Sequence, residues 1–285
     1  MKNNQLPDLD WEKIDLIIEN AFAEDIGDGD VTTNSLFKAE EKAAAFMKVK
    51  ADGIIAGLPI AERVFRKLDP DFGWETNVAE GAAVAAETVF VEMKGARRAL
   101  LSGERLALNI LQRLSGIATQ TAAYVKAAGN TKVKILDTRK TLPGLRVIEK
   151  YAVAVGGGQN HRFGLFDAIM IKDNHIKLAG GIAKAVHTVR QANTKNLPVE
   201  VETSNLAEVE EALTAGADII MLDNMSNDMM RQAVQKIGGR AKVEASGGIT
   251  LERIASIAET GVDYISVGAL THSVKALDIG LYFYG

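Results

Sequence analysis

The sequence predicts an α/β protein in which a mixed first part is followed by alternating helices and parallel strands. Two observations carry this prediction. From residue 116 onward, stretches with helical periodicity alternate with short apolar runs. Residues 214–218 and 259–263 (TAGAD and ETGVD) are near repeats, each with the pattern of a helix end, a glycine cap and a strand start. Strands that alternate with helices pair in parallel, because each return to the sheet needs a crossover.

Composition limits the class of protein. The chain has 285 residues, 47% hydrophobic and 25% charged, which suits one large or two ordinary globular domains. It contains no cysteine, which excludes disulfides, cysteine-ligated metals and a cysteine nucleophile and fits a cytoplasmic location. The first twenty residues lack the layout of a signal peptide, and no apolar run is long enough to span a bilayer. The net charge of −4 argues against nucleic acid or an anionic membrane as the main partner.

The first part is predicted to mix helices and strands. Residues 8–23 have helical spacing, with Asp8 or Asp10 as the cap, and the Asp-Gly run 24–32 predicts a tight loop. That run does not have the spacing of a calcium loop. Further elements are expected as strands within 43–57, 74–76 and 86–94, and as helices over 59–68 and 96–115.

The second part contains six helix and six strand candidates. The helices are expected over 117–129, 144–155, 181–193, 205–215, 226–237 and 250–260. The strands are expected over 133–137, 168–172, 199–202, 218–223, 243–246 and 264–268. Six such units suit an α/β barrel or a doubly wound sheet, and the absence of a GxGxxG turn after any strand weakens the dinucleotide-binding form of the latter.

A barrel makes a further prediction, because its functional groups lie at the C-terminal ends of the strands. Every strand candidate ends in a polar residue or a glycine, namely Asp137, Lys172, Glu202, Asp223, Ser246 and Gly268. Residues 134–177 also concentrate positive charge: eight Lys and Arg against four acids give +4, so the rest of the chain sums to −8. A basic segment in an acidic protein indicates a compact anionic ligand, whereas a solvated charged face is the alternative for any single Lys or Arg.

Three kinds of chemistry meet at these strand ends. Small residues after the last two strands, Ser246-Gly247-Gly248 and Gly268-Ala269, are typical of a phosphate site, although ordinary turns also need glycine. Glu202 and Asp223 suit sugar hydroxyls, Mg²⁺ or a developing cation, or an acid/base pair, or structural pairing with basic residues. A cationic wall comes from Arg139, Lys140, His161, Arg162 and Lys172. A phosphoribosyl donor with a dicarboxylate acceptor would use all three.

Ten motifs along the chain carry a family resemblance. They lie at 24–32, 104–109, 114–119, 137–141, 157–162, 171–175, 199–202, 221–224, 246–248 and 266–272 (EDIGDGDVT, ERLALN, LSGIAT, DTRKT, GGQNHR, IKDNH, VEVE, MLDN, SGG and SVGALTH). In this set and order, the chain resembles the quinolinate phosphoribosyltransferases, also called nicotinate-nucleotide pyrophosphorylases (carboxylating). No departure is found at a position that the family uses for chemistry.

The resemblance implies an architecture and a partner. It implies an N-terminal α/β sandwich domain over 1–115, with the tail 275–285 packed back on it. It implies an incomplete, seven-stranded α/β barrel of the TIM type over 116–274, so one strand is missing from the six above, and we place it near 153–158. It also implies a homodimer in which Arg105 reaches the partner's active site, with no nucleic acid or membrane as partner.

The resemblance further implies the roles of individual residues. Lys140, Glu202 and Asp223 would be catalytic, and Glu202 and Asp223 would contact Mg²⁺ directly or through water. Mg²⁺ would arrive with the donor, 5-phosphoribosyl-1-pyrophosphate (PRPP), and no organic cofactor is expected. The residues expected to bind substrate are Arg105, Thr138, Arg139, Lys140, His161, Arg162, Lys172, Glu202, Asp223, Ser246, Gly247, Gly248, Val267, Gly268 and Ala269.

The implied reaction is phosphoribosyl transfer from PRPP to quinolinate with decarboxylation, which gives nicotinate mononucleotide, pyrophosphate and CO₂. Three alternatives stay open at this point. One is a phosphoribosyltransferase homologue with another pyridine or anionic substrate. Another is a Schiff-base aldolase with Lys172 as nucleophile. The third is a metabolite-binding protein without turnover.

Overall fold

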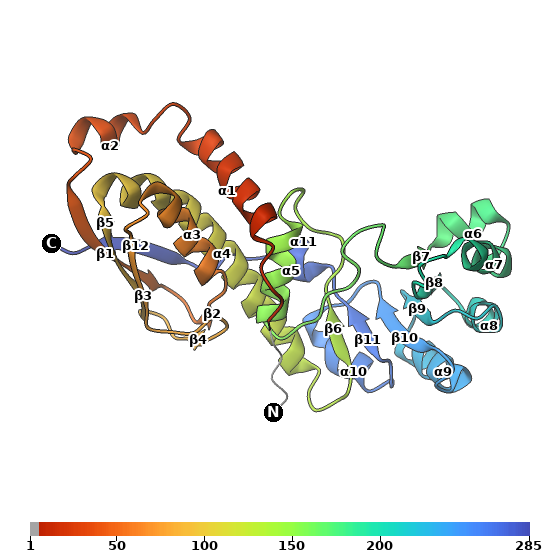
Figure 1. The fold of residues 1–285 in the computed structure, drawn as a ribbon. Coiled ribbons are helices and arrows are strands. Elements are labelled where there is room, and N and C mark those ends of the chain that lie inside the picture. The colour runs from red at the N-terminus through yellow and green to blue at the C-terminus, as the bar shows by residue number, and fades with distance from the viewer. Residues whose placement is uncertain (1–5) are drawn as a thin grey trace. The chain divides into compact units, whose positions relative to one another are not determined.

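The computed structural model describes residues 6–285, and it divides into two compact units. The first five residues of the predicted N-terminal domain lie outside the described range. Unit 1 consists of Met1–Ala122, Thr141–Gly157 and Leu270–Gly285, and unit 2 consists of Ala123–Lys140 and Gly158–Ala269. Each unit contains its own principal sheet, antiparallel in unit 1 and parallel in unit 2 (Figure 1).

Unit 1 is the mixed part that the sequence predicts. Its elements are α1 (Trp11–Asp25), α2 (Val31–Leu36), β1 (Lys42–Val49), β2 (Gly53–Ile54), α3 (Leu58–Leu68), β3 (Gly73–Thr76), β4 (Ala83–Val84), β5 (Val89–Ala96), α4 (Arg97–Ala127, which continues beyond the unit), α5 (Arg146–Val155), α11 (Ala269–His272) and β12 (Ile279–Phe283). The main sheet has the order β12-β1-β5-β3, and β2 pairs with β4. Strand β12 joins the edge of β1, with Ile279 opposite Val49.

The first two helices of unit 1 begin where the sequence supplies caps. The Asp10 side chain accepts the N–H of Lys13 at the start of α1, and Asp30 accepts the N–H of Thr33 at the start of α2. The tight loop expected over 24–32 therefore shrinks to a short turn between two helices. Of its aspartates, Asp30 serves as the cap of α2.

Helix α4 corrects one boundary. The sequence predicts two helices, 96–115 and 117–129, whereas α4 runs unbroken over Arg97–Ala127 and crosses the expected domain limit. Gly116 lies inside it because a side chain has no room there: a Cβ would stand 2.4 Å from the Lys275 carbonyl oxygen. A glycine costs a helix only about 1 kcal/mol relative to alanine, so a long apolar stripe carries the helix through it.

Unit 2 is the predicted set of βα units. Its elements are β6 (Lys134–Leu136), β7 (Ile169–Ile171), α6 (Asp173–Ala179), α7 (Ile182–Ala192), β8 (Val199–Thr203), α8 (Leu206–Thr214), β9 (Ile219–Asp223), α9 (Asn227–Ile237), β10 (Lys242–Ser246), η1 (Leu251–Arg253), α10 (Ile254–Ala258) and β11 (Tyr264–Ser266). All pairs are parallel, in the order β6-β11-β10-β9-β8-β7. Helices α7, α8 and α9 run along the outer side of strands β7 to β10 (Figure 1).

The place of a seventh strand is taken by a single residue. Gln159 forms an isolated parallel bridge with Leu136 at the open edge of β6, donates its N–H to the Ile135 carbonyl, and accepts the N–H of Asp137. The expectation of a strand near 153–158 is wrong, because residues up to Val155 belong to α5. The apolar run there has helical rather than alternating spacing, so it packs as a helix.

The strands of unit 2 alternate their side chains between two faces. In β8 the valines Val199 and Val201 are fully buried on one face, and the glutamates Glu200 and Glu202 share the other. Glu202 and Glu244 both lie in register with Met221 of the intervening strand β9, so the three side chains occupy one face of the sheet. Within residues 6–285, no helix is long and apolar enough to cross a membrane.

Candidate active site

The C-terminal strand ends of unit 2 bring the predicted residues to one edge of the sheet. Glu202, Asp223 and Ser246 are the last or next-to-last residues of β8, β9 and β10, and Lys172 follows β7 directly. Because neighbouring parallel strands end at the same edge, these side chains form a common mouth. Asp137 also follows its strand, β6, but it is fully buried.

On the acidic side, both mouth carboxylates are half-buried and already hold partners. Glu202 forms an ion pair with the Lys172 ammonium, and Asp223 accepts a hydrogen bond from the side-chain amide of Asn224 at 2.7 Å. The Asn224 backbone has a φ of 54° and donates its N–H to the Ser246 carbonyl at 3.0 Å. The loops after β9 and β10 are therefore tied together directly behind the carboxylates.

The Ser-Gly-Gly turn after β10 needs its glycines. Gly247 has a φ of +82°, and a Cβ on it would meet the Asn224 side-chain oxygen at 2.3 Å. Gly248 has a φ of +58°, and its carbonyl accepts a hydrogen bond from Arg253 at 2.8 Å. Close approach of Asn224 thus explains Gly247, and the left-handed backbone favours glycine at 248. The same shape exposes main chain at the mouth, as phosphate sites in barrels do.

On the basic side, two guanidinium groups are held near each other. Arg139 and Arg162 are half-buried, and burial followed by the like charge of Arg139 lowers the pKa of Arg162 below its usual value. Arg162 also donates to the Ala168 carbonyl at 3.3 Å. Thr138 and Lys140 complete the turn after β6: the Lys140 N–H donates to the Thr138 hydroxyl, and the Lys140 side chain is exposed. Like charges brought together out of water indicate an anionic ligand.

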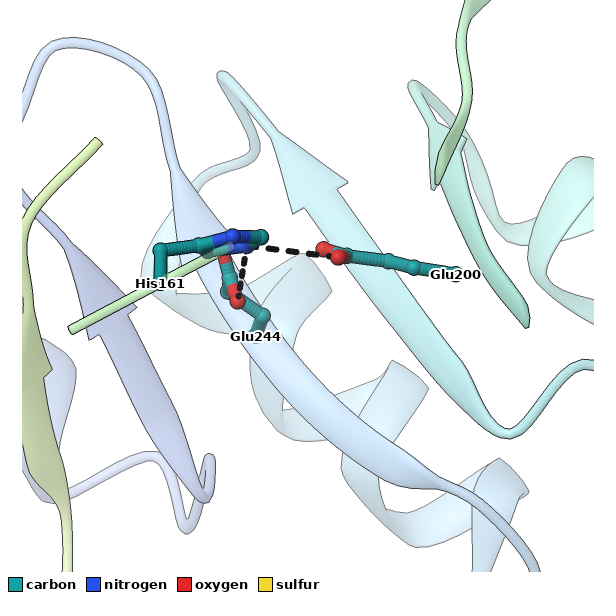
Figure 2. A group of neighbouring side chains, drawn as sticks. All are labelled: His161, Glu200 and Glu244. Carbon is teal, nitrogen blue, oxygen red and sulfur yellow. Dashed lines mark ion pairs between the residues drawn. The ribbon is translucent and has the colours of Figure 1, made fainter. Parts of the chain in front are cut away.

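His161 leads to two residues that the sequence did not single out. Its Nε2 atom lies 3.3 Å from Glu200 Oε2 and 3.4 Å from Glu244 Oε2, below the mouth (Figure 2). Both glutamates are buried, two residues before Glu202 and Ser246 on their strands. The signal was present in the sequence, because a glutamate that alternates with buried valines in a parallel strand must lie inside the barrel.

The protonation of this cluster follows from its geometry. Burial lowers the pKa of His161, but hydrogen bonds to Glu200 and Glu244 outweigh it and raise the pKa to about 10. Burial, reinforced by the charge of Glu244, also raises the pKa of Glu200. His161 Nδ1 accepts the N–H of Arg162 at 2.7 Å, which an imidazolium cannot do. We therefore place the single ring proton on Nε2. The raised pKa then describes an additional proton that is bound by the cluster of His161, Glu200 and Glu244 as a whole.

Of the remaining expected substrate-binding residues, one lies in unit 1 and three follow strand β11. Arg105 is exposed on α4 and belongs to unit 1. Val267 is buried and donates its N–H to the Leu136 carbonyl at 2.9 Å, so it supports the strand end. Gly268 and Ala269 are half-buried and follow β11, so they lie at the same C-terminal edge of the sheet as the other strand ends.

Comparison with known proteins decides the family. Residues 30–115 match the model of the quinolinate phosphoribosyl transferase N-terminal domain, and residues 117–282 match that of the C-terminal domain. The chain belongs to the quinolinate phosphoribosyltransferase family.

Individual relatives of this family match over most of the chain. The chain is 48% identical to a probable nicotinate-nucleotide pyrophosphorylase (carboxylating) of Synechocystis sp., over 95% of this chain and 92% of that protein. It is 47% identical to the corresponding protein of Bacillus subtilis, over 93% and 91%. The crystal structure of NadC from Streptococcus pyogenes superposes with a TM-score of 0.93 at 44% identity, over 98% of this chain and all of that one. The predicted α/β fold class is thereby confirmed.

Family membership and geometry together weaken the aldolase alternative. A Schiff-base lysine needs a desolvated amine without a counter-ion. In this quinolinate phosphoribosyltransferase family member, Lys172 is ion-paired with Glu202 and 43% of its side chain is exposed. Its surroundings suit a cation that binds anions.

Proposed function

We propose that the mouth of unit 2 is where quinolinate takes the phosphoribosyl group from PRPP. The reaction is that of the family: the chain acts as a decarboxylating quinolinate phosphoribosyltransferase in NAD biosynthesis. The observation that carries the placement is the separation of charge along one sheet edge. Arg139 and Arg162 form a basic side, and Glu202 and Asp223 form an acidic side.

The basic side suits the acceptor. Quinolinate carries two adjacent carboxylates, and guanidinium groups bind carboxylates through paired N–H donors. Arg139, Arg162 and Lys172, with His161 beside them, would hold the two carboxylates and keep the pyridine nitrogen turned toward the donor. Lys172 would exchange part of its contact with Glu202 for the ligand. Thr138 lies on the same turn and would support this orientation.

The acidic side suits the donor. Glu202 and Asp223 offer oxygens that accept from ribose hydroxyls, and such hard oxygen donors also suit Mg²⁺, which enters with PRPP as its complex. The loop Ser246–Gly248, together with Val267, Gly268 and Ala269, would contact the 5-phosphate through main chain and hydroxyl. The exposed Lys140 would neutralise phosphate charge.

The two sides together account for the chemistry. As the C1–pyrophosphate bond breaks, positive charge develops on the ribose, and Glu202 and Asp223 stabilise it. Lys140 stabilises the charge on the leaving group. The pyridine nitrogen forms the new bond to C1, and the ring becomes cationic. That ring accepts the electron pair of the adjacent C–CO₂ bond, so CO₂ leaves, and a proton from solvent replaces it on carbon.

The assembly belongs to the proposal as well. We propose a homodimer in which Arg105, exposed on α4, completes the partner's basic side. The domain limits 1–115 and 116–274, with the tail on the first domain, and the cytoplasmic location stay predictions. The pairing of β12 with β1 supports the tail's assignment.

A product assay tests the function. The purified protein, given quinolinate, PRPP and Mg²⁺, is expected to form nicotinate mononucleotide and pyrophosphate in equal amounts. Nicotinate in place of quinolinate is expected to give little product, because the basic side is built for two carboxylates. A preference for nicotinate would favour the alternative of another pyridine substrate, and no product with either would reject the function.

A further inference from the structure

An interior cluster lies below the mouth, and its two glutamates take no part in the steps above. His161 is held between Glu200 on β8 and Glu244 on β10, which are 3% and 1% exposed (Figure 2). Strand β9 separates β8 from β10, so the imidazole links two strands that are not neighbours in the sheet. Two acids and one imidazole inside a barrel therefore need an explanation.

Stability does not supply that explanation. The Oε1 atoms of both Glu200 and Glu244 are buried and have no hydrogen-bond partner among residues 6–285. Each carboxylate taken out of water costs several kcal/mol, and apolar side chains of similar volume often serve a core as well or better. A cluster with unsatisfied buried oxygens is expected where it serves a function.

A metal site is the obvious alternative, because the three ligand atoms lie within 4.8 Å of one another. The hydrogen bonding of the ring excludes it. His161 Nδ1 accepts the Arg162 N–H, so the proton of the neutral ring is on Nε2, the nitrogen that faces the glutamates. A protonated nitrogen has no lone pair for a metal ion, and it donates to the carboxylates instead.

The ring is connected in turn to the acceptor side. The His161 backbone N–H donates to Asp137 Oδ1 at 2.8 Å, and the ring receives the Arg162 N–H. Glu200 and Glu244 are charged groups that act on the ring, Asp137 accepts from its backbone, and Arg162, beside the ring, feels the charge of Arg139. The orientation of the ring fixes where the backbone of residue 162 lies.

We propose that Glu200 and Glu244 are positioning residues for the quinolinate side of the mouth. They hold the His161 ring from below, and the ring holds the backbone that carries Arg162. The inference rests on the proposed function. It concerns binding of the acceptor, and the donor side is expected to be independent of it.

Isosteric variants test the proposal. Glu200→Gln and Glu244→Gln keep the shape and remove the charge, and KM for quinolinate is expected to rise at least about tenfold, since misplacement of a binding group by about 1 Å can cost 10²-fold. KM for PRPP is expected to stay within about twofold. Glu80→Gln is the matched control, because Glu80 is a half-buried carboxylate of unit 1 that caps α3 through the N–H groups of Gly57 and Leu58. It is expected to leave both KM values unchanged.

Several outcomes would overturn the proposal. One is an unchanged KM for quinolinate in folded Glu200→Gln and Glu244→Gln, and another is an equal rise in both KM values. A stoichiometric divalent cation in the purified protein that is lost in Glu244→Gln would show a metal site instead. A wild-type protein that makes no nicotinate mononucleotide would reject the proposed function, and the wild-type rate therefore separates the two failures.

A second measurement needs no folded variant of the glutamates. In ¹⁵N spectra of the wild-type histidines, the His161 signals are identified by their loss in His161→Gln. The ring is expected to show a protonated Nε2 and an unprotonated Nδ1, unchanged from pH 6 to 8. A ring that titrates near the ordinary histidine pKa of about 6.5, or that is doubly protonated, would contradict the hydrogen bond to Arg162 and overturn the proposal.

Discussion

Glu200 and Glu202 lie two residues apart on one strand and face the same side, yet their surroundings differ. Glu202 at the mouth is half-buried, pairs with Lys172 and lies where a substrate can reach it. Glu200 below it is almost fully buried and holds His161. The same contrast separates Asp223 at the mouth from Glu244 in the interior. The position along the strand therefore determines the role. The mouth carboxylates are placed to contact the substrates, and the interior carboxylates contact other protein groups.

The largest expected effect is at the mouth. Asp223→Asn removes charge that stabilises the developing ribosyl cation, and kcat is expected to fall by about 10²-fold to 10³-fold, as when other preorganised charges are removed. Steady-state kinetics with saturating substrates measures it. Retention of the wild-type kcat would show that the acidic side is not part of the reaction.

Substitution on the basic side is expected to have the next largest effect. Arg139→Ala leaves a carboxylate of the acceptor without its partner, which costs about 2–4 kcal/mol, or roughly 30-fold to 10³-fold in kcat/KM for quinolinate. Arg139→Lys serves as the comparison, because it keeps the charge and loses the paired donors. Activity at the wild-type level in Arg139→Ala would move the acceptor away from this wall.

A pair of variants on β8 breaks the comparison most cleanly. Glu202→Gln is expected to lower kcat and to raise KM for PRPP, whereas Glu200→Gln is expected to raise KM for quinolinate by about tenfold with a smaller change in kcat. The two substitutions are chemically identical and lie two residues apart. If both variants show the same kinetic pattern, depth along the strand does not separate the roles.

The turn behind the mouth gives a smaller effect. Gly247→Ala places a Cβ against the Asn224 side chain at a backbone angle that alanine rarely adopts, which costs on the order of 1–3 kcal/mol of stability. KM for PRPP is expected to rise severalfold, because the loop after β10 shifts. Thermal unfolding and initial rates measure the two effects. Gly216→Ala, which has a similar φ of +83° in open space away from the mouth, is the control.

The smallest effect is the pH dependence of stability that the interior cluster creates. The raised pKa of about 10 found at His161 belongs to the cluster as a whole: the extra proton is held by the glutamates while the ring stays neutral, so the folded cluster binds more protons than the unfolded chain. Its contribution is fully present below the unfolded histidine pKa of about 6.5 and is lost as pH rises through about 10. In urea unfolding, the free energy of unfolding is expected to fall less steeply between pH 7 and 10 in Glu200→Gln/Glu244→Gln than in wild type. Equal slopes would contradict the shared proton.

The sequence predicted the mouth better than the interior. Parallel βα units force their strand ends to one edge, so Glu202, Asp223 and Ser246 followed from alternation alone. Glu200 and Glu244 were missed because the strand-end rule selects the last residues of each strand, and these glutamates lie two positions earlier. Their partner, His161, lies outside any regular strand. No periodic pattern indicates which carboxylates such a residue meets.

Local patterns also failed where tertiary packing decides. The break expected at Gly116 does not occur, because the glycine serves close packing against residue 275 within one long helix. The seventh barrel position is filled by Gln159 alone. A single bridging residue cannot show the alternation of apolar and polar residues that predicts a strand. The role of Arg105 rests on the family, since its position on α4 says nothing of a second subunit.

Release of CO₂ from quinolinate labelled at the carboxylate next to the ring nitrogen tests the central claim most directly. Release is expected to require both PRPP and Mg²⁺, to equal the nicotinate mononucleotide formed, and to fall together with it in Asp223→Asn. Release without PRPP, or product formation without release, would contradict a site that couples the two steps across one mouth.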